Sequence, residues 1–525
     1  MIRLSPNPNR ADLVHWLEWE EDAFRKAREQ DKPVMLFLGA FWCRYCQRMD
    51  EEAFSDRENM ALLNAYFVAF RVEDAKRPDI DARYNLNGWP TIAFLTPEGE
   101  LLAALNYLPT EEFKEVLLNV YLSYQQEHAK TGSSAQKDES RSGAAHPAAV
   151  ERSPASALDE ITNTTMALAD RVNGGYGRGQ KFINAEANDF LLARYETTQD
   201  SHYLAHVCLT LDRMREGPIH DFKDGAYFRT TTGADWSQPH REKLLAEQAG
   251  LLSNCLRSFR LTRRAEYAAM AEEIIGYLDN NLFDSSTGAF FGCEDFLRCE
   301  TSAGASADEF FTIIDDCIYV DANAVTIVAY MEAAAILNRP DCKERALHAL
   351  EFLWNCCRVA ENGMYHYYDG EPRLPGLLSD QAHVGLALVR AFLATHEEKY
   401  LERARELAEF IIARLKNPGG GYFDLCASEL GFRKFPLTEI SQNGVAASFF
   451  LKLSVALSDA KYRESTLWAL DAFTGDFTGH GIHAAPFGRA LGESLSLPTV
   501  DSLQAAEKTS VHPSTGSGRT ESDSK

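Results

Sequence analysis

Two cysteines separated by two residues, Cys43 and Cys46, constrain the fold of this chain more than any other feature. They follow directly after the apolar segment 32–40, which is opened by proline and has the length of a buried strand. The next segment, 47–54, is predicted to be helical, so the pair lies at a strand-to-helix junction. A Cys-x-x-Cys motif in that position indicates a redox site.

The two cysteines are expected to have different roles. Cys43 lies at the predicted helix N-terminus, where the helix dipole and nearby amides favour the thiolate, and Arg44 adds positive charge. Cys46, one turn later, is placed to resolve a mixed disulfide. The alternatives are half of a zinc site or two ordinary core thiols. A zinc site requires further ligands, and residues 47–126 contain neither cysteine nor histidine.

A second signal lies in the Gly88-Trp89-Pro90-Thr91 segment, where proline opens an apolar run and the X-Pro bond can be cis. With the cysteine motif and the hairpin at 94–101, the first 120 or so residues resemble a thioredoxin-like domain. The resemblance implies that Trp89 and Pro90 form a substrate platform. Thioredoxins carry a buried acid six residues before the first cysteine. That position is Phe37 here, so the usual proton acceptor is absent.

Length and charge restrict the remaining possibilities. A chain of 525 residues is expected to form two or three domains. A formal charge of −24 argues against binding to nucleic acid or to anionic membrane surfaces. No apolar run has the length of a membrane helix, and residues 1–8 lack the apolar region of a secretory signal. The eleven cysteines show no framework spacing, which predicts a reducing, cytoplasmic location. No cofactor is expected.

Composition divides the chain into four parts. Residues 1–126 form the thioredoxin-like domain, with helices predicted at 13–31, 51–64, 79–84 and 110–126 and a second strand at 67–72. Residues 127–154 lack large apolar side chains and are predicted to be a flexible linker. Residues 155–500 form a second domain, and residues 501–525 are predicted to be a disordered tail.

The second domain contains an internal repeat. Paired helical patterns, such as 322–338 with 341–358 and 380–395 with 399–415, are followed by turns that combine glycine with an aromatic or apolar residue. These turns begin at Asn173, Asp224, Thr287, Asn362, Gly420 and Gly479. Six helical hairpins predict an all-α (α/α)6 toroid of the six-hairpin glycosidase kind, with the loops gathered at one mouth. Such loops can bind a sugar ring, or the aromatic side chains can simply fill the barrel.

The whole chain resembles the domain-of-unknown-function 255 group, also called the YyaL or spermatogenesis-associated protein 20 family. The resemblance implies this two-domain architecture more directly than it implies a reaction. It rests on an N-terminal and a C-terminal set of segments: 19–24, 31–33, 43–46, 77–81 and 88–90; then 174–177, 181–182, 240–249, 315–323, 378–382 and 441–443.

Three functions remain open. The first is a thiol–disulfide oxidoreductase that acts on a protein disulfide partner through Cys43 and Cys46. The second is a carbohydrate-active barrel, which as a hydrolase requires two carboxylates across a cleft and as an epimerase would use histidines such as His240 and His383. The third is a barrel that binds a sugar or a protein without catalysis.

Candidate residues in the barrel follow from its motifs. The acids at predicted hairpin mouths are Glu242, Asp316, Asp321 and Asp380. The candidate substrate-binding residues are Tyr176, His240, Lys243, Asn323 and Asn443. Because Asp is common at helix N-caps, Asp321 and Asp380 also have a purely structural interpretation. No metal site is predicted, and His366 is interpreted as a loop or core histidine.

Overall fold

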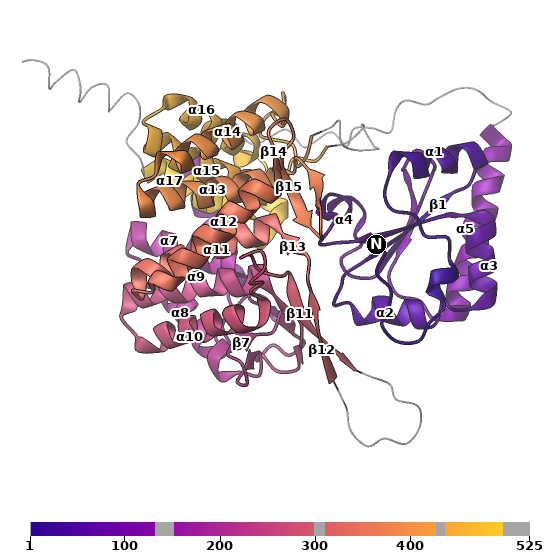
Figure 1. Cartoon of the computed structure of the whole chain (residues 1–525), viewed down its shortest axis with the longest axis horizontal. Coiled ribbons are helices and arrows are strands. Elements are labelled where there is room, and N and C mark those ends of the chain that lie inside the picture. Colours follow the sequence, from indigo (N-terminus) through magenta and orange to yellow (C-terminus); the bar gives the residue numbers. More distant parts are fainter. Residues whose placement is uncertain (1, 132–151, 299–309, 427–435, 497–525) are drawn as a thin grey trace, which may run out of the picture.

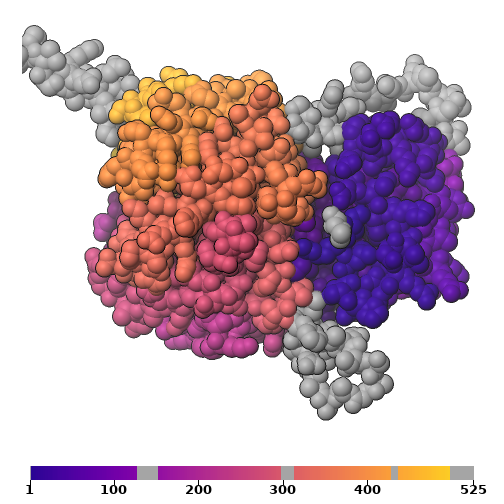
Figure 2. Space-filling view, viewed as in Figure 1, coloured from indigo at the N-terminus to yellow at the C-terminus, as the bar shows by residue number. Residues whose placement is uncertain are grey.

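The chain forms two domains that lie side by side (Figure 1). The computed structural model describes residues 2–131, 152–298, 310–426 and 436–496. The predicted tail, 501–525, lies outside the described residues, as does most of the predicted linker. Figure 2 shows the surfaces of the two domains in contact along one side of each.

The N-terminal domain is built on a four-stranded sheet of order β2-β1-β3-β4. β1 is parallel to β2 and antiparallel to β3, and β3 is antiparallel to β4. The strands are β1 (Val34–Gly39), β2 (Val68–Glu73), β3 (Thr91–Leu95) and β4 (Leu101–Leu105). The helices are α1 (Glu21–Gln30), α2 (Arg44–Glu51), α3 (Arg57–Tyr66), α4 (Pro78–Tyr84) and α5 (Thr110–Thr131). This is the predicted thioredoxin-like α/β fold.

β1 is a continuous apolar run because both faces of the sheet are covered. Met35 and Phe37 belong to a core cluster that also contains Cys43 and Cys46. The residues between them, such as Leu36, point to the opposite core, which contains Phe24 of α1. The start of α2 therefore packs against β1, an inner strand whose residues are all buried.

Two helix predictions for this domain are wrong. The predicted helix 13–31 begins only at Glu21, because residue Leu17 instead pairs with Phe70 beside the sheet. Its N–H donates to the carbonyl of Ala69 at 2.8 Å, a tertiary contact that local periodicity does not reveal. The predicted helix 51–64 begins too early, because α2 ends at Glu51 and α3 starts only after Asp56, whose carboxylate caps its first turn.

The C-terminal domain is the predicted (α/α)6 toroid. Within the described residues six helices form an inner ring: α7 (Ala185–Thr198), α9 (Leu245–Thr262), α11 (Val320–Ile336), α13 (Leu378–Thr395), α15 (Ile440–Leu457) and α17 (Ala485–Ser496). The outer helices are α6 (Pro154–Leu168), α8 (Ser201–Glu216), α10 (Ala265–Tyr277), α12 (Pro340–Cys356), α14 (Glu398–Arg414) and α16 (Ala460–Thr474). α17 packs against α7 and closes the ring, and α6 completes the last hairpin with α17.

Short strands accompany the loops that lead into the inner helices. They are β5 (Lys181–Phe182), β6 (His220–Asp221), β7 (Ala226–Tyr227), β8 (Thr230–Thr231), β9 (Pro239–His240), β10 (Lys243–Leu244), β11 (Cys293–Arg298), β12 (Phe310–Asp315), β13 (Ile318–Tyr319), β14 (Arg358–Val359), β15 (Gly363–Tyr368) and β16 (Pro372–Pro375). By length and composition α15 could cross a membrane, but 61% of its residues are buried inside the toroid, as expected for a core helix.

A repeated amide contact fixes these loops. The fourth residue of inner helices α7, α9, α11, α13 and α15 is a buried Asn or Gln: Asn188, Gln248, Asn323, Gln381 and Asn443. In α11 the Asn323 side chain accepts from the N–H of Phe290 at 2.8 Å and donates to its carbonyl at 2.9 Å. Gln248, Gln381 and Asn443 contact Tyr227, Met364 and Tyr422 in the same way. Four of the six repeats thus use one amide to satisfy a buried loop backbone.

Candidate functional site

The two cysteines of the motif form a disulfide at the start of α2. Cys43 is the N-cap of this helix, and its sulfur accepts the N–H of Cys46 at 3.1 Å. Both are nearly buried, with 5% of Cys43 and 3% of Cys46 exposed. The Trp89–Pro90 peptide bond is cis, and Trp89 packs against the core cluster that contains both cysteines. The structure therefore brings together all four residues of the predicted redox site.

The aromatic side chains beside the disulfide lie against the toroid. The Trp42 and Trp89 rings meet edge to face with centroids 5.2 Å apart. The guanidinium of Arg229, from the toroid, lies 3.9 Å from the centroid of the Trp42 ring. Arg229 also donates to Glu242 at 3.0 Å, which anchors it within its own domain. One side of the redox site is thus formed by the second domain.

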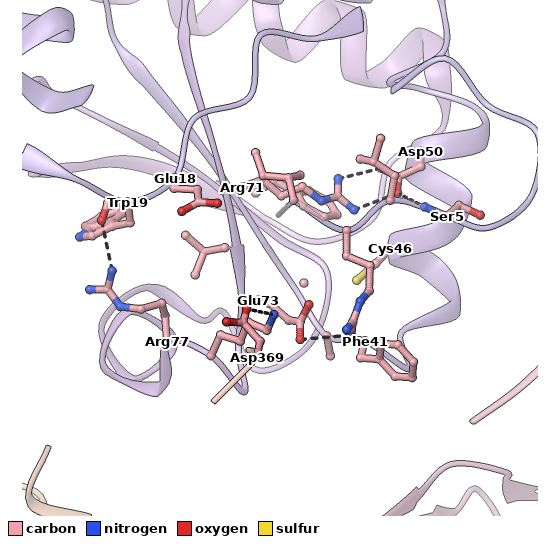
Figure 3. A pocket seen from close by; sticks show the side chains of 18 of the residues that line it. Ser5, Glu18, Trp19, Phe41, Cys46, Asp50, Arg71, Glu73, Arg77 and Asp369 are labelled. Atoms are coloured by element: carbon pink, nitrogen blue, oxygen red, sulfur yellow. Dashed lines mark hydrogen bonds and ion pairs between the residues drawn. The ribbon is translucent and has the colours of Figure 1, made fainter. Parts of the chain in front are cut away.

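A cavity of about 490 Å³ lies behind Cys46 (Figure 3). Phe37 and Asp50 line it on the side of the N-terminal domain, and Ile314 and Tyr367 line it on the side of the toroid. The Asp50 carboxylate is fully buried and forms a two-pronged ion pair with Arg71 at 2.7 and 2.8 Å. Burial raises the pKa of Asp50, and Arg71 opposes that rise. A buried acid is therefore present near Cys46, although position 37 is phenylalanine.

The segment that follows β2 docks into the toroid. Glu73 accepts from the hydroxyl of Tyr319 at 3.3 Å, and the carbonyl of Ala75 lies 2.8 Å from Nε2 of His366. Lys76 pairs with Asp369 at 3.5 Å. Two further ion pairs cross the interface, Arg3 with Asp315 and Arg83 with Asp424. These contacts place the N-terminal domain over the end of the toroid where the inner helices begin, which we call the toroid mouth.

His366 joins the mouth to the N-terminal domain. Its Nδ1 lies 3.1 Å from both carboxylate oxygens of Asp380, while Nε2 faces the Ala75 carbonyl. Burial alone lowers the pKa of His366, but the Asp380 carboxylate raises it to about 9. Asp321 completes a cluster whose potential ligand atoms lie within 4.8 Å of one another. Since both ring nitrogens of His366 already face acceptors, this cluster fits a buried ion pair better than a metal site.

Other polar side chains converge on the mouth from the inner helices. The hydroxyl of Ser379 donates to Asp321 at 2.9 Å, and Nδ1 of His383 lies 2.9 Å from the carbonyl of Ser379. Nδ1 is the donor in this contact, which makes Nε2 the acceptor nitrogen of the neutral ring. Burial raises the pKa of Glu186 on α7, while His383 and His483 lower it. Glu186 and His483 are both accessible to water.

A second cluster of acidic side chains surrounds Arg229. Burial raises the pKa of Glu247, at the start of α9, to about 8, and burial raises that of Asp295 to about 7. Oε2 of Glu247 and Oδ1 of Asp74 are buried and have no hydrogen-bond partner among the described residues. Asp74 comes from the N-terminal domain, so both domains contribute acids to this space.

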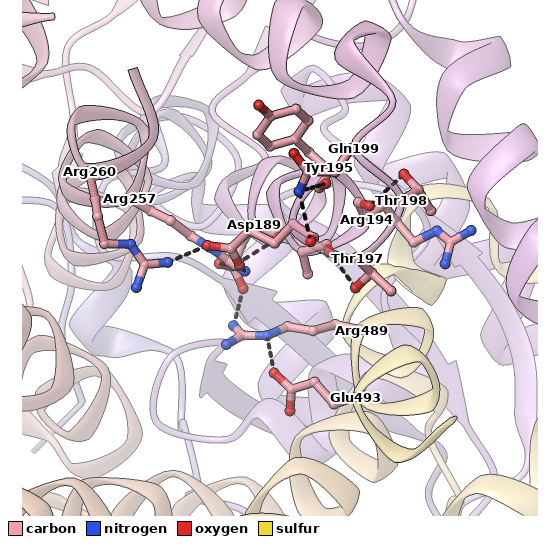
Figure 4. Close-up of polar contacts among 12 residues, drawn as sticks. Asp189, Arg194, Tyr195, Thr197, Thr198, Gln199, Arg257, Arg260, Arg489 and Glu493 are labelled. Carbon is pink, nitrogen blue, oxygen red and sulfur yellow. Dashed lines mark hydrogen bonds and ion pairs between the residues drawn. The ribbon is translucent and has the colours of Figure 1, made fainter. Parts of the chain in front are cut away.

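An ion-pair network lies deeper in the ring, one turn along α7 from Glu186 (Figure 4). Asp189 is held by Arg257 of α9 and Arg489 of α17, and Arg489 also donates to Glu493 at 3.1 Å. Residues three apart on a helix share one face, so Asp189 lies below Glu186. The network links the three inner helices α7, α9 and α17.

The predicted barrel residues do not form one group. Asp321 and Asp380 meet at His366, whereas Glu242 is paired with Arg229 and Asp316 is exposed elsewhere. Lys243 is fully buried among three carboxylates, and His240 has a half-exposed side chain. The predicted ligands Asn323 and Asn443 are loop-fixing amides, and the Tyr176 hydroxyl donates to Asn188 at 3.0 Å. Their assignment as sugar ligands stays a prediction.

Sequence reasoning missed four side chains: Asp50, Glu186, Glu247 and His483. The last three share a signal, because each lies within the first three residues of an inner helix or just before one. Asp50 had a signal as well, since it follows Cys46 by one helical turn.

Fold and site together define a thioredoxin-like redox domain joined to an (α/α)6 toroid. Residues 7–141 match the family model described as "Protein of unknown function, DUF255", whose short name refers to a thioredoxin-like DsbH domain. The N-terminal domain is therefore similar to the DUF255 family, and the resemblance drawn from its motifs is confirmed.

Curated relatives support both domains. Human spermatogenesis-associated protein 20 is 30% identical over 305 residues, covering 54% of this chain and 39% of that protein. Uncharacterized protein B0495.5 of Caenorhabditis elegans is 25% identical over 470 residues, or 76% of this chain and 62% of the relative. Disulfide bond reductase DsbH of Chlamydia pneumoniae is 24% identical over 107 residues, covering 18% of this chain and 64% of that protein. The chain spans less than two thirds of the length of each of these relatives.

Solved structures match the toroid. A sugar epimerase from a ruminal bacterium has a TM-score of 0.53 at 13% identity, covering 65% of this chain and 100% of the other. Cellobiose 2-epimerase from Bacillus thermoamylovorans has a TM-score of 0.52 at 14% identity, covering 64% and 98%. At such low identity the likeness establishes the fold alone.

Proposed function

We propose that this protein is a thiol–disulfide oxidoreductase that exchanges disulfides through Cys43 and Cys46. The observation that carries the proposal is the Cys43–Cys46 disulfide at the N-terminus of α2, beside the cis Trp89–Pro90 bond. The amide of Cys46 and the helix dipole both favour a thiolate at Cys43 when the pair is reduced. The similarity to a protein named disulfide bond reductase supports the same chemistry.

The substrate in this proposal is a protein disulfide that approaches past the exposed Arg44 and Tyr45. A reducing compartment, such as the cytoplasm, remains the proposed location, because most of the other cysteines within the described residues are free thiols. The formal charge of −24 favours a partner without a strongly acidic surface.

A trapping experiment tests the proposal. In a Cys46→Ser chain the mixed disulfide between Cys43 and its substrate cannot be resolved, so it accumulates. We expect the reduced Cys46→Ser chain to form a stable mixed disulfide with a disulfide-containing test protein such as oxidised insulin. A Cys43→Ser/Cys46→Ser chain is the matched control. If both chains form the same adducts, exchange occurs at other thiols and the proposal fails.

A second function for the toroid is favoured by the groups at its mouth. Nδ1 of His383 faces the carbonyl of Ser379, so Nε2 is the acceptor nitrogen of the neutral ring, and Glu186, an acid with a raised pKa, is close enough to feel the charge of His383. A sugar epimerase needs a base to remove a proton next to a carbonyl and an acid to return one. We propose that the mouth binds a reducing sugar and can exchange that proton.

Deuterium uptake from heavy water tests this second function. We expect mannose or cellobiose to gain deuterium next to the carbonyl in the presence of the protein, and His383→Asn to abolish the uptake. Glu402→Gln is the control, because Glu402 is exposed on outer helix α14. Absence of both sugar binding and deuterium uptake would contradict a sugar-processing role.

A further inference from the structure

Asp50 and Cys46 lie on one face of α2. They are four residues apart, so their side chains are neighbours along the helix. Both line the cavity behind the disulfide (Figure 3). The N–H of Ser5 donates to Oδ2 of Asp50 at 2.8 Å, in addition to the two contacts from Arg71. The carboxylate is thus held at a fixed place beside the cysteine.

Because position 37 carries phenylalanine, an acid beside Cys46 has to come from another element. A Cβ atom at Gly39 would lie 3.1 Å from the Phe37 ring and 3.3 Å from the sulfur of Cys46, so ring and sulfur flank the same glycine. Arg71 stands opposite Phe37 in the parallel register of β1 and β2, with its guanidinium 4.6 Å from the ring centroid. Arg71 therefore reaches across the ring and holds Asp50 on the far side. An acid on the helix takes the place of an acid on the strand.

We propose that Asp50 accepts the proton of Cys46 when Cys46 resolves the mixed disulfide on Cys43. This rests on the oxidoreductase function proposed above. In the step, the Cys46 S–H bond breaks and its proton passes to the Asp50 carboxylate across the shared cavity. The Cys46 sulfur then forms a bond to the Cys43 sulfur. The bond from Cys43 to the substrate sulfur breaks, and the substrate leaves as a thiolate that takes a proton from solvent. The two electrons come from the Cys43–Cys46 dithiol, which an external dithiol must have reduced.

The surroundings of Asp50 suit a reversible proton acceptor. Burial and the nearby Glu51 raise its pKa, while Arg71 and the Ser5 amide lower it. Glu51 is itself engaged by the hydroxyl of Ser5 at 2.6 Å and the amide of Asn7 at 2.8 Å. Glu73, the next acid of the cavity, pairs with Arg3 and Tyr319 at the domain interface. Glu18, Glu20 and Asp369 also line the cavity, but among its acids Asp50 is the one on the same helix as Cys46.

Stopped-flow reaction of the reduced chain with dithiobis(nitrobenzoate) tests the proposal. Attack by Cys43 releases one thionitrobenzoate, and resolution by Cys46 releases a second, so the two steps appear as separate phases. The signal of a Cys43→Ser/Cys46→Ser chain is subtracted to remove the other thiols. We expect Asp50→Asn to leave the first phase unchanged and to slow the second by about 10²-fold at neutral pH, the usual size of a general-base effect.

The pH profile separates proton transfer from a structural role. With Asp50 as acceptor, the second phase of the native chain levels off once the carboxyl is ionised. In Asp50→Asn the rate instead keeps rising with pH until the thiol ionises by itself. Formate, a small base that fits the cavity, should restore part of the lost rate. An Asp50→Asn/Arg71→Met chain, which leaves no unpaired charge, should behave in the same way.

The outcomes are distinguishable. An unchanged second phase and pH profile in both Asp50 variants would overturn the role of Asp50 while leaving the redox function intact. A native chain that shows a first phase but no second would overturn the oxidoreductase function, and the role of Asp50 with it.

Discussion

The redox domain and the toroid place their chemistry in opposite ways. In the N-terminal domain the reactive pair lies within one motif, and the start of α2 fixes the position of both sulfurs. In the toroid the polar groups of the mouth come from different repeats, from Glu186 on α7 to His483 just before α17. A site contained in a motif can be located from sequence, whereas a site assembled from repeats requires knowing which face of each helix points inward.

The repeats also show that neighbouring polar residues have different roles. The acids within the first three residues of the inner helices lie at the mouth, while the amide at the fourth residue holds the loop backbone. The redox domain has no such division, because its reactive residues are themselves part of the helix cap.

Cys43→Ser should show the largest difference between the two regions in thiol–disulfide exchange. We expect this change to abolish the reduction of glutathione disulfide at the motif, since the remaining thiol, Cys46, is assigned to resolve the mixed disulfide rather than to attack. His383→Asn at the toroid mouth should leave that reaction unchanged. The release of glutathione checks both, and a glutathione adduct on Cys46 of Cys43→Ser in the same yield as on Cys43 of Cys46→Ser, measured by mass spectrometry, would contradict the assigned roles.

The loop-fixing amides should matter for stability. Asn443→Ala leaves the N–H and the carbonyl of Tyr422 buried without their partner. We expect a loss of about 2–4 kcal/mol in the free energy of unfolding. Gln442→Ala is the matched control at the adjacent position, since Oε1 of Gln442 has no hydrogen-bond partner within the described residues. Denaturant unfolding measures both, and equal losses would refute the specific role of the amide.

The junction between the regions should depend on pH. His366 has a folded-state pKa of about 9, above its ordinary value near 6.5, because Asp380 and Ala75 accept both ring protons. Its contribution to stability is therefore complete below about pH 6.5 and is lost as the pH rises through about 9, on the order of 1–3 kcal/mol. His366→Asn should flatten this decline in the thermal unfolding midpoint. A thermal unfolding midpoint that rises between about pH 6.5 and 9 in the native chain, but not in His366→Asn, would contradict the predicted direction of this effect.

The smallest effect should come from the outer ion pairs of the interface. Lys76 and Asp369 are 3.5 Å apart and partly exposed. Lys76→Ala should therefore change the free energy of unfolding by less than about 1 kcal/mol. High salt should remove the difference between this variant and the native chain. A larger, salt-independent loss would show that Lys76 contributes packing rather than charge.

Local patterns predicted much of the fold. β1, the cysteine motif and the cited toroid helices lie within about two residues of their predicted positions, because each is defined by its own periodicity. The prediction failed at residues 13–20, where pairing with β2 overrides helical periodicity. The candidate site was located at Cys43 and Cys46 but not at Asp50 or Glu186. Sequence alone does not tell which of many acids is turned inward by the fold.

A redox titration of the purified protein in graded dithiol buffers, read by the mass shift on alkylation, tests the central claim most directly. The account predicts a two-electron transition of Cys43 and Cys46 between roughly −270 and −120 mV, the range of working thiol–disulfide catalysts. Cys43→Ser should abolish it. A transition below about −300 mV, typical of a structural disulfide, or one that survives in Cys43→Ser, would contradict the assignment of this pair as the active site.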